Sequence, residues 1–241
     1  MIIRRLASSQ QLITQPAHAA LAARIMRAWS SSHFPESPRK VSILNAVEQH
    51  DCGWAVADEA LVVDETTGQL LDFTEVSDAV KRDTSSRGLE PLTSDPYAAA
   101  LAAQHRLHVY RRYGDHPGWR AFFEEMTAAR DSYLHAARGD SLDELLRDYW
   151  FVRAGDLASL AFCNNWADTP DDGCGYSFYV AETSLTVVPD PLDGRTVDIA
   201  IDARVIDNQY FASPADARRV VTSASHVRLE GQVRGGNAPR T

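Results

Sequence analysis

The chain has 241 residues, of which 44% are hydrophobic, and this is enough for one large domain, or one domain with a small extension, without disulfides. Its formal net charge of −9 argues against a protein that binds the phosphate backbone of nucleic acids, because such a protein needs a basic surface to displace counterions. A small anionic substrate is not excluded, since a bound metal can supply local positive charge.

Three cysteines are spread along the chain without a CxxC pair: Cys52, Cys163 and Cys174. An odd number without such a pair indicates reduced thiols. No long apolar stretch follows the arginines near the N-terminus, so no signal peptide is expected. No run approaches the roughly 18 apolar residues that span a membrane. The sequence predicts a cytoplasmic protein that acts on a small molecule, without membrane or nucleic-acid partners, and leaves its oligomeric state open.

Two predicted helices near the N-terminus carry polar residues on apolar faces. The first covers residues 15–30 and has a proline in its first turn, and His18 lies one turn before the apolar residues Leu21, Ile25 and Trp29. The second covers residues 39–51, and its shared face holds Ile43, Val47, His50 and Asp51. Gly53 is a plausible stop for this helix.

Asp95 and Pro96 mark the start of a third helix, because they supply an N-cap and a first-turn proline. This helix is expected to reach about Tyr113 and to carry His105 in phase with Leu101. The other predictions for the middle of the chain are an ordered loop, a polar region with one short helix, and a further helix, at residues 55–73, 74–94 and 117–137.

A capping box from Ser141 to Glu144 opens the longest predicted helix, which reaches about Asn164. Asp156 is the only charged residue in its apolar stripe. The other members of the stripe are Leu142, Leu145, Leu146, Tyr149, Val152, Leu160 and Cys163. A carboxylate on such a face must be paired, hydrogen-bonded or bound to a cation.

After Pro170 the pattern changes to strand-like alternation. Two strands, a short helix and a last strand are expected at residues 176–188, 195–205, from 213, and 227–233, with residues 2–4 as a further pairing segment. We therefore predict a mainly α protein with a small C-terminal antiparallel β appendage, α+β overall. The expected domains are a helical metal-binding core, a β-rich extension packed on it and a disordered tail, at residues 1–170, 171–235 and 236–241.

The polar residues on the helix faces form a ligand set for a metal ion. His18 and His50 offer neutral imidazoles, while Asp51 and Asp156 offer carboxylates that need a counter-charge. Two imidazoles with two carboxylates suit iron, manganese or zinc. A divalent ion would offset both carboxylates and activate a bound water as a nucleophile. The alternative is a buried polar network in which Asp156 pairs with Arg153 or with an arginine of another helix.

The order His18, His50-Asp51, Asp156 resembles the H…HD…D signature of the HD-domain superfamily of metal-dependent phosphohydrolases. The resemblance implies an HD-like helical bundle in which separate helices supply the ligands. More narrowly, residues 10–235 are similar to a bacterial HD-like family of unknown function, which offers no activity to transfer. The segments that carry this similarity are Ile13-Thr14-Gln15-Pro16-Ala17-His18-Ala19, Glu48-Gln49-His50-Asp51-Cys52-Gly53-Trp54, Thr67-Gly68 with Phe73, and Asp156-Leu157-Ala158-Ser159-Leu160.

The resemblance also implies roles for further residues. HD phosphodiesterases with two metals carry extra histidines between the HD pair and the last aspartate, which makes His105 a candidate ligand or substrate contact. Asp51 and Gln15 are the candidate catalytic residues, and Gln15 can donate to a substrate oxygen or to metal-bound water. Trp54 and Gln15 are candidate substrate contacts. Packing for Trp54 and a helix-start role for Gln15 are the structural alternatives.

Three functions are compatible with this pattern. The first is hydrolysis of a phosphoester in a small metabolite or nucleotide, by water activated on one or two divalent ions. No basic motif lies next to the ligands in sequence, and Lys81, Arg82 and Arg87, the nearest candidates, are expected to be solvated. The second is a di-iron oxygenase of the HD fold, which His105 favours. The third is a catalytically inactive metal- or ligand-binding module.

Overall fold

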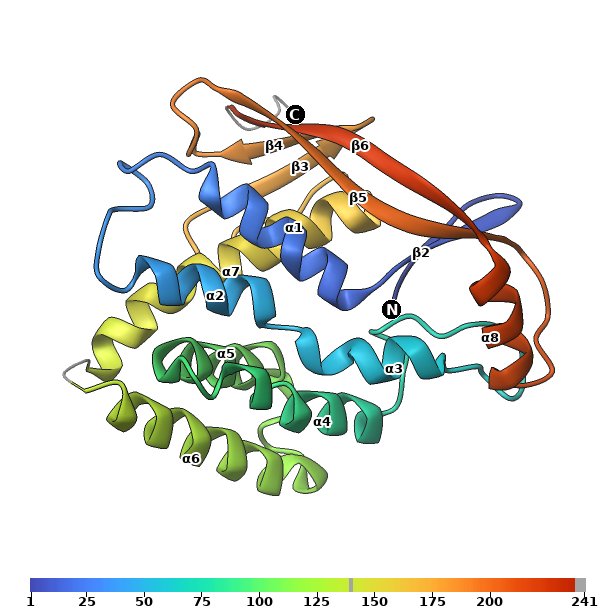
Figure 1. The fold of residues 1–241 in the computed structure, drawn as a ribbon, viewed down its shortest axis with the longest axis horizontal. Helices are drawn as coiled ribbons and strands as arrows, with labels where there is room; N and C mark the ends of the chain where they lie inside the picture. The colour runs from blue at the N-terminus through green and yellow to red at the C-terminus, as the bar shows by residue number, and fades with distance from the viewer. Residues whose placement is uncertain (139–140, 237–241) are drawn as a thin grey trace.

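The helical part of the protein consists of stacked layers. The computed structural model describes residues 1–138 and 141–236. Figure 1 shows α1 and α7 lying between a curled sheet and the helices α2, α5 and α6. The bounds of the helices are α1 (Gln15–Arg27), α2 (Lys40–Gln49), α3 (Ala55–Ala60), α4 (Asp78–Arg87), α5 (Pro96–Val109), α6 (Arg120–Ala136), α7 (Leu142–Asn164) and α8 (Pro214–Ser223).

The sheet has six strands in the order β1-β2-β5-β6-β4-β3. It is mixed, because β4 and β6 run parallel while every other neighbouring pair is antiparallel. The long strands β5 and β6 cross the sheet diagonally and bring it over α1 (Figure 1). The bounds of the strands are β1 (Ile2–Arg5), β2 (Ser9–Ile13), β3 (Ser177–Ala181), β4 (Ser184–Val188), β5 (Thr196–Asp207) and β6 (Ser225–Gly235).

The prediction of a mainly α, or all-α, protein with a small antiparallel β appendage is wrong. The chain is about 49% helix and 19% strand, and its curled sheet forms a substantial half-barrel, so the fold is α+β. The sequence of β2, Ser-Gln-Gln-Leu-Ile, has no alternation that would indicate a strand. Pairing with β5, close to the other end of the chain, places it in the sheet. The first strand, β1, pairs with β2 instead of with a C-terminal strand.

The structure does not test the predicted domain division or the predicted disordered tail. The division into domains at residue 170 stays a prediction, although β1 and β2 show that the sheet takes strands from both ends of the chain. The predicted disordered tail lies, from residue 237 onward, outside the described residues.

The starts of the long helices follow from the residues that cap them. The amide of Ala17 donates to Thr14 at the start of α1, at 3.3 Å, and the amide of Ala98 donates to Asp95 at the start of α5, at 3.1 Å. The predicted capping box of α7 is present, with Ser141 as the N-cap. The helix predicted to end at Asp51 ends instead at Gln49, so the HD pair lies at and just beyond its C-terminus.

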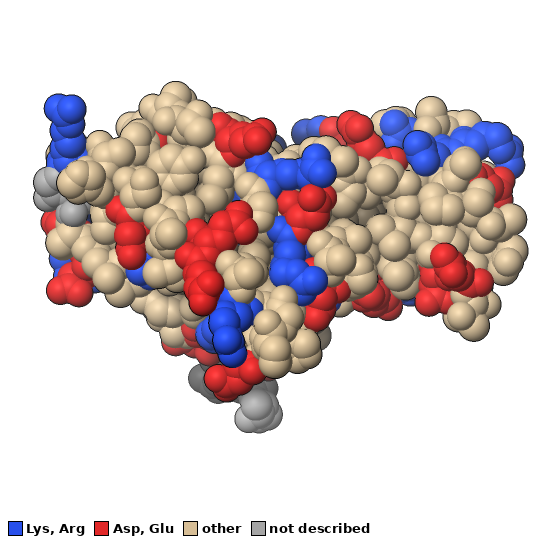
Figure 2. Space-filling view, turned by 90° about the horizontal axis from the view of Figure 1, so that it is seen from below, with Lys and Arg blue, Asp and Glu red and all other residues tan. Residues whose placement is uncertain are grey.

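The longest helix, α7, runs through the main hydrophobic core and contacts α1, α2, α5 and three strands of the sheet. A smaller cluster packs between the sheet and α8 and contains Leu12, Phe211 and Val221. None of the helices in the described part of the chain is long and apolar enough to cross a membrane. Acidic and basic side chains are interspersed on the face shown in Figure 2, so the negative net charge is not gathered into one acidic surface there.

Candidate metal centre

Four side chains from α1, α7 and the C-terminal end of α2 meet in the core. His18 comes from α1, His50 and Asp51 from the end of α2, and Asp156 from α7, and one ligand atom of each lies within 4.8 Å of the others. Both imidazoles are fully covered and Asp156 is 3% exposed, whereas Asp51 is 18% exposed. The sequence-predicted ligand set is therefore brought together in a cluster that could hold a metal ion.

A glycine beside the last ligand allows the three helices to approach. A Cβ atom on Gly155 would lie 2.8 Å from Cγ of Met26 in α1 and 2.9 Å from Cγ1 of Val47 in α2. Any side chain here would therefore force the side chains of Met26 and Val47, or the helices that carry them, to shift. Gly155 precedes Asp156 directly, so the close packing sets the distance of that carboxylate from the histidines.

The hydrogen bonds of the two imidazoles leave both Nε2 atoms with bare lone pairs. Nδ1 of His50 donates to the carbonyl oxygen of Val47 at 2.7 Å. Nδ1 of His18 contacts Oγ of Ser159, whose hydroxyl in turn donates to the carbonyl oxygen of Asp156 at 3.3 Å, so the network assigns the His18 proton to Nδ1. In the neutral rings both Nε2 atoms are then acceptors.

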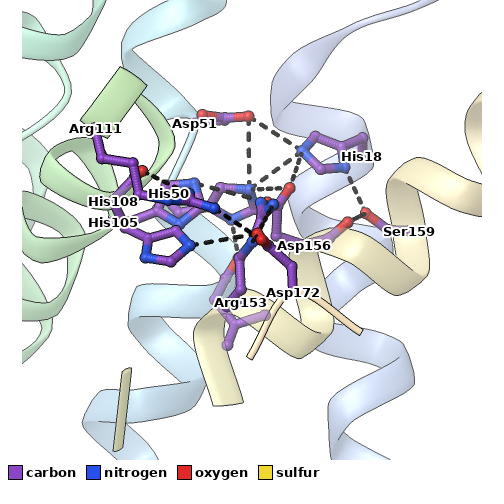
Figure 3. A network of polar contacts seen from close by, with 11 residues as sticks. His18, His50, Asp51, His105, His108, Arg111, Arg153, Asp156, Ser159 and Asp172 are labelled. Atoms are coloured by element: carbon purple, nitrogen blue, oxygen red, sulfur yellow. Dashed lines mark hydrogen bonds and ion pairs between the residues drawn. The ribbon is translucent and has the colours of Figure 1, made fainter. Parts of the chain in front are cut away.

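These acceptors converge with two carboxylates (Figure 3). The two Nε2 atoms of His18 and His50 are 3.2 Å apart. Nε2 of His18 lies 3.1 Å from Oδ2 of Asp51, and Nε2 of His50 lies 3.4 Å from Oδ1 of Asp156. Acceptors this close require a cation between them, either a proton or a metal ion. The nitrogen and oxygen donors fit a divalent transition metal.

Without a metal, the cluster keeps a proton. Burial disfavours a charge on His50, but the carboxylates of Asp51 and Asp156 outweigh it and raise the pKa of His50 to about 9. Burial likewise opposes ionisation of Asp51, but His50 and His18 lower the pKa of that carboxyl to about 2. The pKa of Asp156 is also held well below its usual range, against its burial, by the hydrogen bond and charge of His50 and by the charge of Arg153. The centre therefore attracts positive charge.

His105 lies next to the cluster but outside the group of four. It comes from α5, and its Nε2 is 3.8 Å from Oδ2 of Asp156, while its ring centroid is 4.8 Å from that of His50. Burial lowers the pKa of His105 to about 3, so the ring is neutral. Among the described residues its Nδ1 has no hydrogen-bond partner.

Arg153 links the cluster to a second set of charges. Its Nη1 donates to Oδ2 of Asp156 at 2.6 Å, which is the ion pair named above as part of the alternative to a metal site. Its Nε and Nη2 donate to Oδ2 of Asp172 at 3.1 and 2.7 Å. Asp172 also accepts from Arg111 and lies beside His108 (Figure 3). One guanidinium thus bridges the buried carboxylate and a carboxylate from the segment after α7.

A cavity of about 380 Å³ opens beside Asp51, His105 and Asp156. Trp54 is buried and borders this cavity, and its role as a substrate contact stays a prediction. The apolar surface of the cavity also includes Phe73, Val109, Tyr110 and Leu160. Its basic residues are Lys81, Arg111, Arg112 and Arg153. A larger cavity of about 600 Å³ lies elsewhere and touches none of the four clustered residues, so volume alone does not mark the chemistry.

The expectation that Lys81 is solvated is wrong, because its side chain is buried and lines the cavity. Its Nζ donates to the carbonyl oxygen of Thr74 at 3.0 Å. Sequence reasoning did not single out Arg111, Arg112 or Asp172. An Arg-Arg pair one turn after His108 is the only local signal, and nothing in its periodicity indicates a cavity.

Gln15 is the first residue of α1 and does not line this cavity. Its side chain is fully buried, and both polar atoms of its amide lack partners among the described residues. Its backbone amide donates to Oδ2 of Asp58 at 2.6 Å. It precedes His18 by one helical turn, but no hydrogen bond among the described residues joins its side-chain amide to the cluster, so its catalytic and substrate-binding roles stay predictions.

Comparison with known proteins gives a family without an assigned activity. Neither the curated proteins nor the solved structures contain a significant match to the chain. The family model described as "Protein of unknown function (DUF3891)" matches residues 1–209, which is most of the sequence. The chain therefore belongs to the DUF3891 family.

Proposed function

We propose that this protein is a metal-dependent hydrolase that cleaves a phosphoester in a small metabolite or nucleotide. The observation that carries the proposal is the convergence of two bare Nε2 atoms and two carboxylates beside a cavity with basic and aromatic walls. The resemblance to the HD-domain superfamily stays part of this proposal. The three free cysteines fit a reducing compartment, in keeping with the proposed cytoplasmic location.

His18, His50, Asp51 and Asp156 would hold the ion. A divalent ion bound there lowers the pKa of a bound water and polarises a phosphoryl oxygen. The protein's own part is to fix the ligands: Val47 and Ser159 orient the imidazoles, and Arg153 holds Oδ2 of Asp156.

Asp51 is the ligand best suited to handle a proton. It is the most exposed of the four, and it lines the cavity in which a substrate would lie. Its Oδ2 faces the histidines, at 3.1 Å from His18. A carboxylate at the border of the cavity could hydrogen-bond an attacking water and take up its proton.

The basic side chains support an anionic substrate. Lys81 is a buried ammonium whose only hydrogen bond among the described residues goes to a neutral carbonyl, so an anion in the cavity would offset its charge. Arg111 and Arg153 present guanidinium groups suited to bidentate contact with phosphate. The aromatic walls at Trp54 and Phe73 fit an organic moiety.

The contacts of Asp156 favour one ion over the two ions of an oxygenase. A second ion next to His105 would use Oδ2 of Asp156, and Arg153 already donates to that oxygen at 2.6 Å. His105 is 3.8 Å away from it. The guanidinium supplies the positive charge that a second metal would bring.

Metal analysis combined with an activity assay tests the proposal. The protein is purified without chelator, its metal is quantified by mass spectrometry, and hydrolysis of 4-nitrophenyl phosphate is measured. We expect close to one divalent ion per chain, and loss of both metal and activity in His50→Ala. His135→Ala, on the exposed surface of α6, is the matched control and keeps both.

The other outcomes point to the other functions. Two irons per chain, with consumption of oxygen, would support the oxygenase. Absence of metal in the purified and the reconstituted protein would support the inactive binding module.

A further inference from the structure

Asp172 occupies a site built for an anion. Its Oδ2 accepts from Nε and Nη2 of Arg153 at 3.1 and 2.7 Å, and its Oδ1 accepts from Nη2 of Arg111 at 2.8 Å. Nε2 of His108 lies 3.4 Å from Oδ2. Three side chains thus surround one carboxylate: His108 from α5, Arg111 from the turn after α5 and Arg153 from α7 (Figure 3).

The same donors face the cavity beside the metal cluster. Arg111, Arg153 and Asp172 all line it, together with Asp156. A guanidinium binds carboxylates and phosphate oxygens with the same fork of N–H donors. A phosphate group that entered the cavity would therefore meet the donors that Asp172 now uses.

The position of Asp172 allows it to be replaced. Its side chain is 30% exposed, and it belongs to the segment that joins α7 to β3 and contains no helix or strand. The turn that follows is held by Asp171, whose Oδ1 accepts from the amides of Gly173 and Gly175, both at 2.9 Å. Release of the Asp172 carboxylate would leave those hydrogen bonds intact.

We propose that Asp172 is a built-in competitor of the substrate, whose phosphate group binds Arg111 and Arg153 by displacing the Asp172 carboxylate. The inference deepens the proposed hydrolase function, on which it rests for the identity of the anion. It assigns Arg111 and Arg153 as the phosphate-binding pair and Asp172 as the residue that limits affinity for it.

Binding of inorganic phosphate to the full chain tests this assignment. Phosphate is titrated calorimetrically into wild type and Asp172→Asn, each loaded with Mn²⁺ and each metal-free. We expect Asp172→Asn to bind phosphate at least tenfold more tightly, because the asparagine keeps the size of the side chain but not its charge. That gain corresponds to about 1.4 kcal/mol. Asp168→Asn removes the same charge from an exposed position in the same segment and should change the affinity less than twofold.

A second variant assigns the donors. Arg111→Gln should weaken phosphate binding at least tenfold and should abolish the gain when combined with Asp172→Asn. Unchanged or weaker binding in Asp172→Asn, with an unchanged thermal unfolding midpoint, would overturn the proposal, and so would the absence of phosphate binding in every variant.

The outcomes separate this inference from the hydrolase proposal. If Asp172→Asn tightens phosphate binding while no phosphoester is hydrolysed, the anion site stands and the hydrolase does not. If wild type hydrolyses a phosphoester while Asp172→Asn gains no affinity for phosphate, the hydrolase stands and the competitor role falls.

Discussion

At the scale of single residues, the cluster depends on groups that orient its imidazoles. Ser159 fixes the proton of His18 on Nδ1, and the carbonyl oxygen of Val47 does the same for His50. Such partners raise the basicity of a ligand and fix its orientation. Their loss should therefore lower the metal affinity more than it lowers the stability of the fold. Substitution of a candidate ligand and substitution of a residue that orients a ligand should therefore have different effects.

Ser159→Ala should lower the affinity for a divalent metal about 10- to 100-fold, because the His18 ring loses the partner that sets its tautomer. The measurement is competition with a fluorescent chelator. Ser132→Ala, on the exposed face of α6, serves as the control and should bind metal like wild type. Equal affinity in the two variants would show that Ser159 has no part in orienting His18.

The metal-free protein should lose stability as the pH rises from about 6.5 to 9. His50 has a pKa of about 9 in the folded protein, against an ordinary value of 6.5, so its proton stabilises the fold fully below 6.5 and is lost as the pH passes 9. Each unit of such a shift corresponds to about 1.4 kcal/mol.

Thermal unfolding midpoints of chelator-treated protein across this range measure the effect. A bound metal replaces the proton, so the midpoint of the loaded protein should not fall in the same window. His50→Ala should lose the dependence, and a metal-free midpoint that is constant or rises with pH would contradict the assignment.

At the scale of elements, the sequence predicts what is local and misses what is distant. The helices α5 and α7 are predicted from the caps Asp95 and Ser141 and from the apolar stripe around Asp156. Caps and helical phase depend on residues within one or two turns. The ligand residues are recognisable since each breaks an apolar face. Arg111 and Asp172 leave no such mark, as their pairing joins segments on either side of α6 and α7. The half-barrel is missed for the same reason: β2 becomes a strand through its pairing with β5.

Gly155→Ala should destabilise the protein by about 1–3 kcal/mol, as expected for overpacking between helices. Alanine would normally favour a helix over glycine by about 1 kcal/mol, so steric crowding has to outweigh propensity for this sign to appear. Denaturant unfolding and metal affinity are both measured, because displacement of α7 also moves Asp156. A variant with greater stability and undiminished metal binding would mean that the helices do not depend on this close approach.

At the scale of the whole molecule, the first strand supports the helix that carries the last ligand. Arg4 in β1 donates to the carbonyl oxygens of Phe162 and Cys163 at 2.6 and 3.1 Å. These carbonyls lie in the last turn of α7, where helical carbonyls lack regular partners, and the carbonyl of Phe162 also accepts the amide of the C-cap residue Asn165 at 3.2 Å. The N-terminal strand, the sheet and the candidate ligand cluster are thus joined through one helix.

Arg4→Gln should destabilise the fold by about 1–3 kcal/mol, since it removes charged hydrogen bonds to two carbonyls at the end of α7, and that of Cys163 has no other hydrogen-bond partner among the described residues. Arg120→Gln, at an exposed position in α6, is the control. Urea unfolding followed by circular dichroism gives the two free energies. Equal values for both variants would show that β1 does not cap α7.

The route of the chain through the sheet also has a consequence for biosynthesis. Gln10 pairs with Ile206, and His18 meets Asp156, so neither the sheet nor the ligand cluster can close until most of the polypeptide has left the ribosome. Contacts this distant in sequence slow folding, because loop closure precedes any gain from pairing. His18, His50 and Asp51 leave the ribosome long before Asp156, the fourth member of the cluster, is synthesised. The ion of the proposed function would therefore have to enter late, through the cavity of a fold that is already closed.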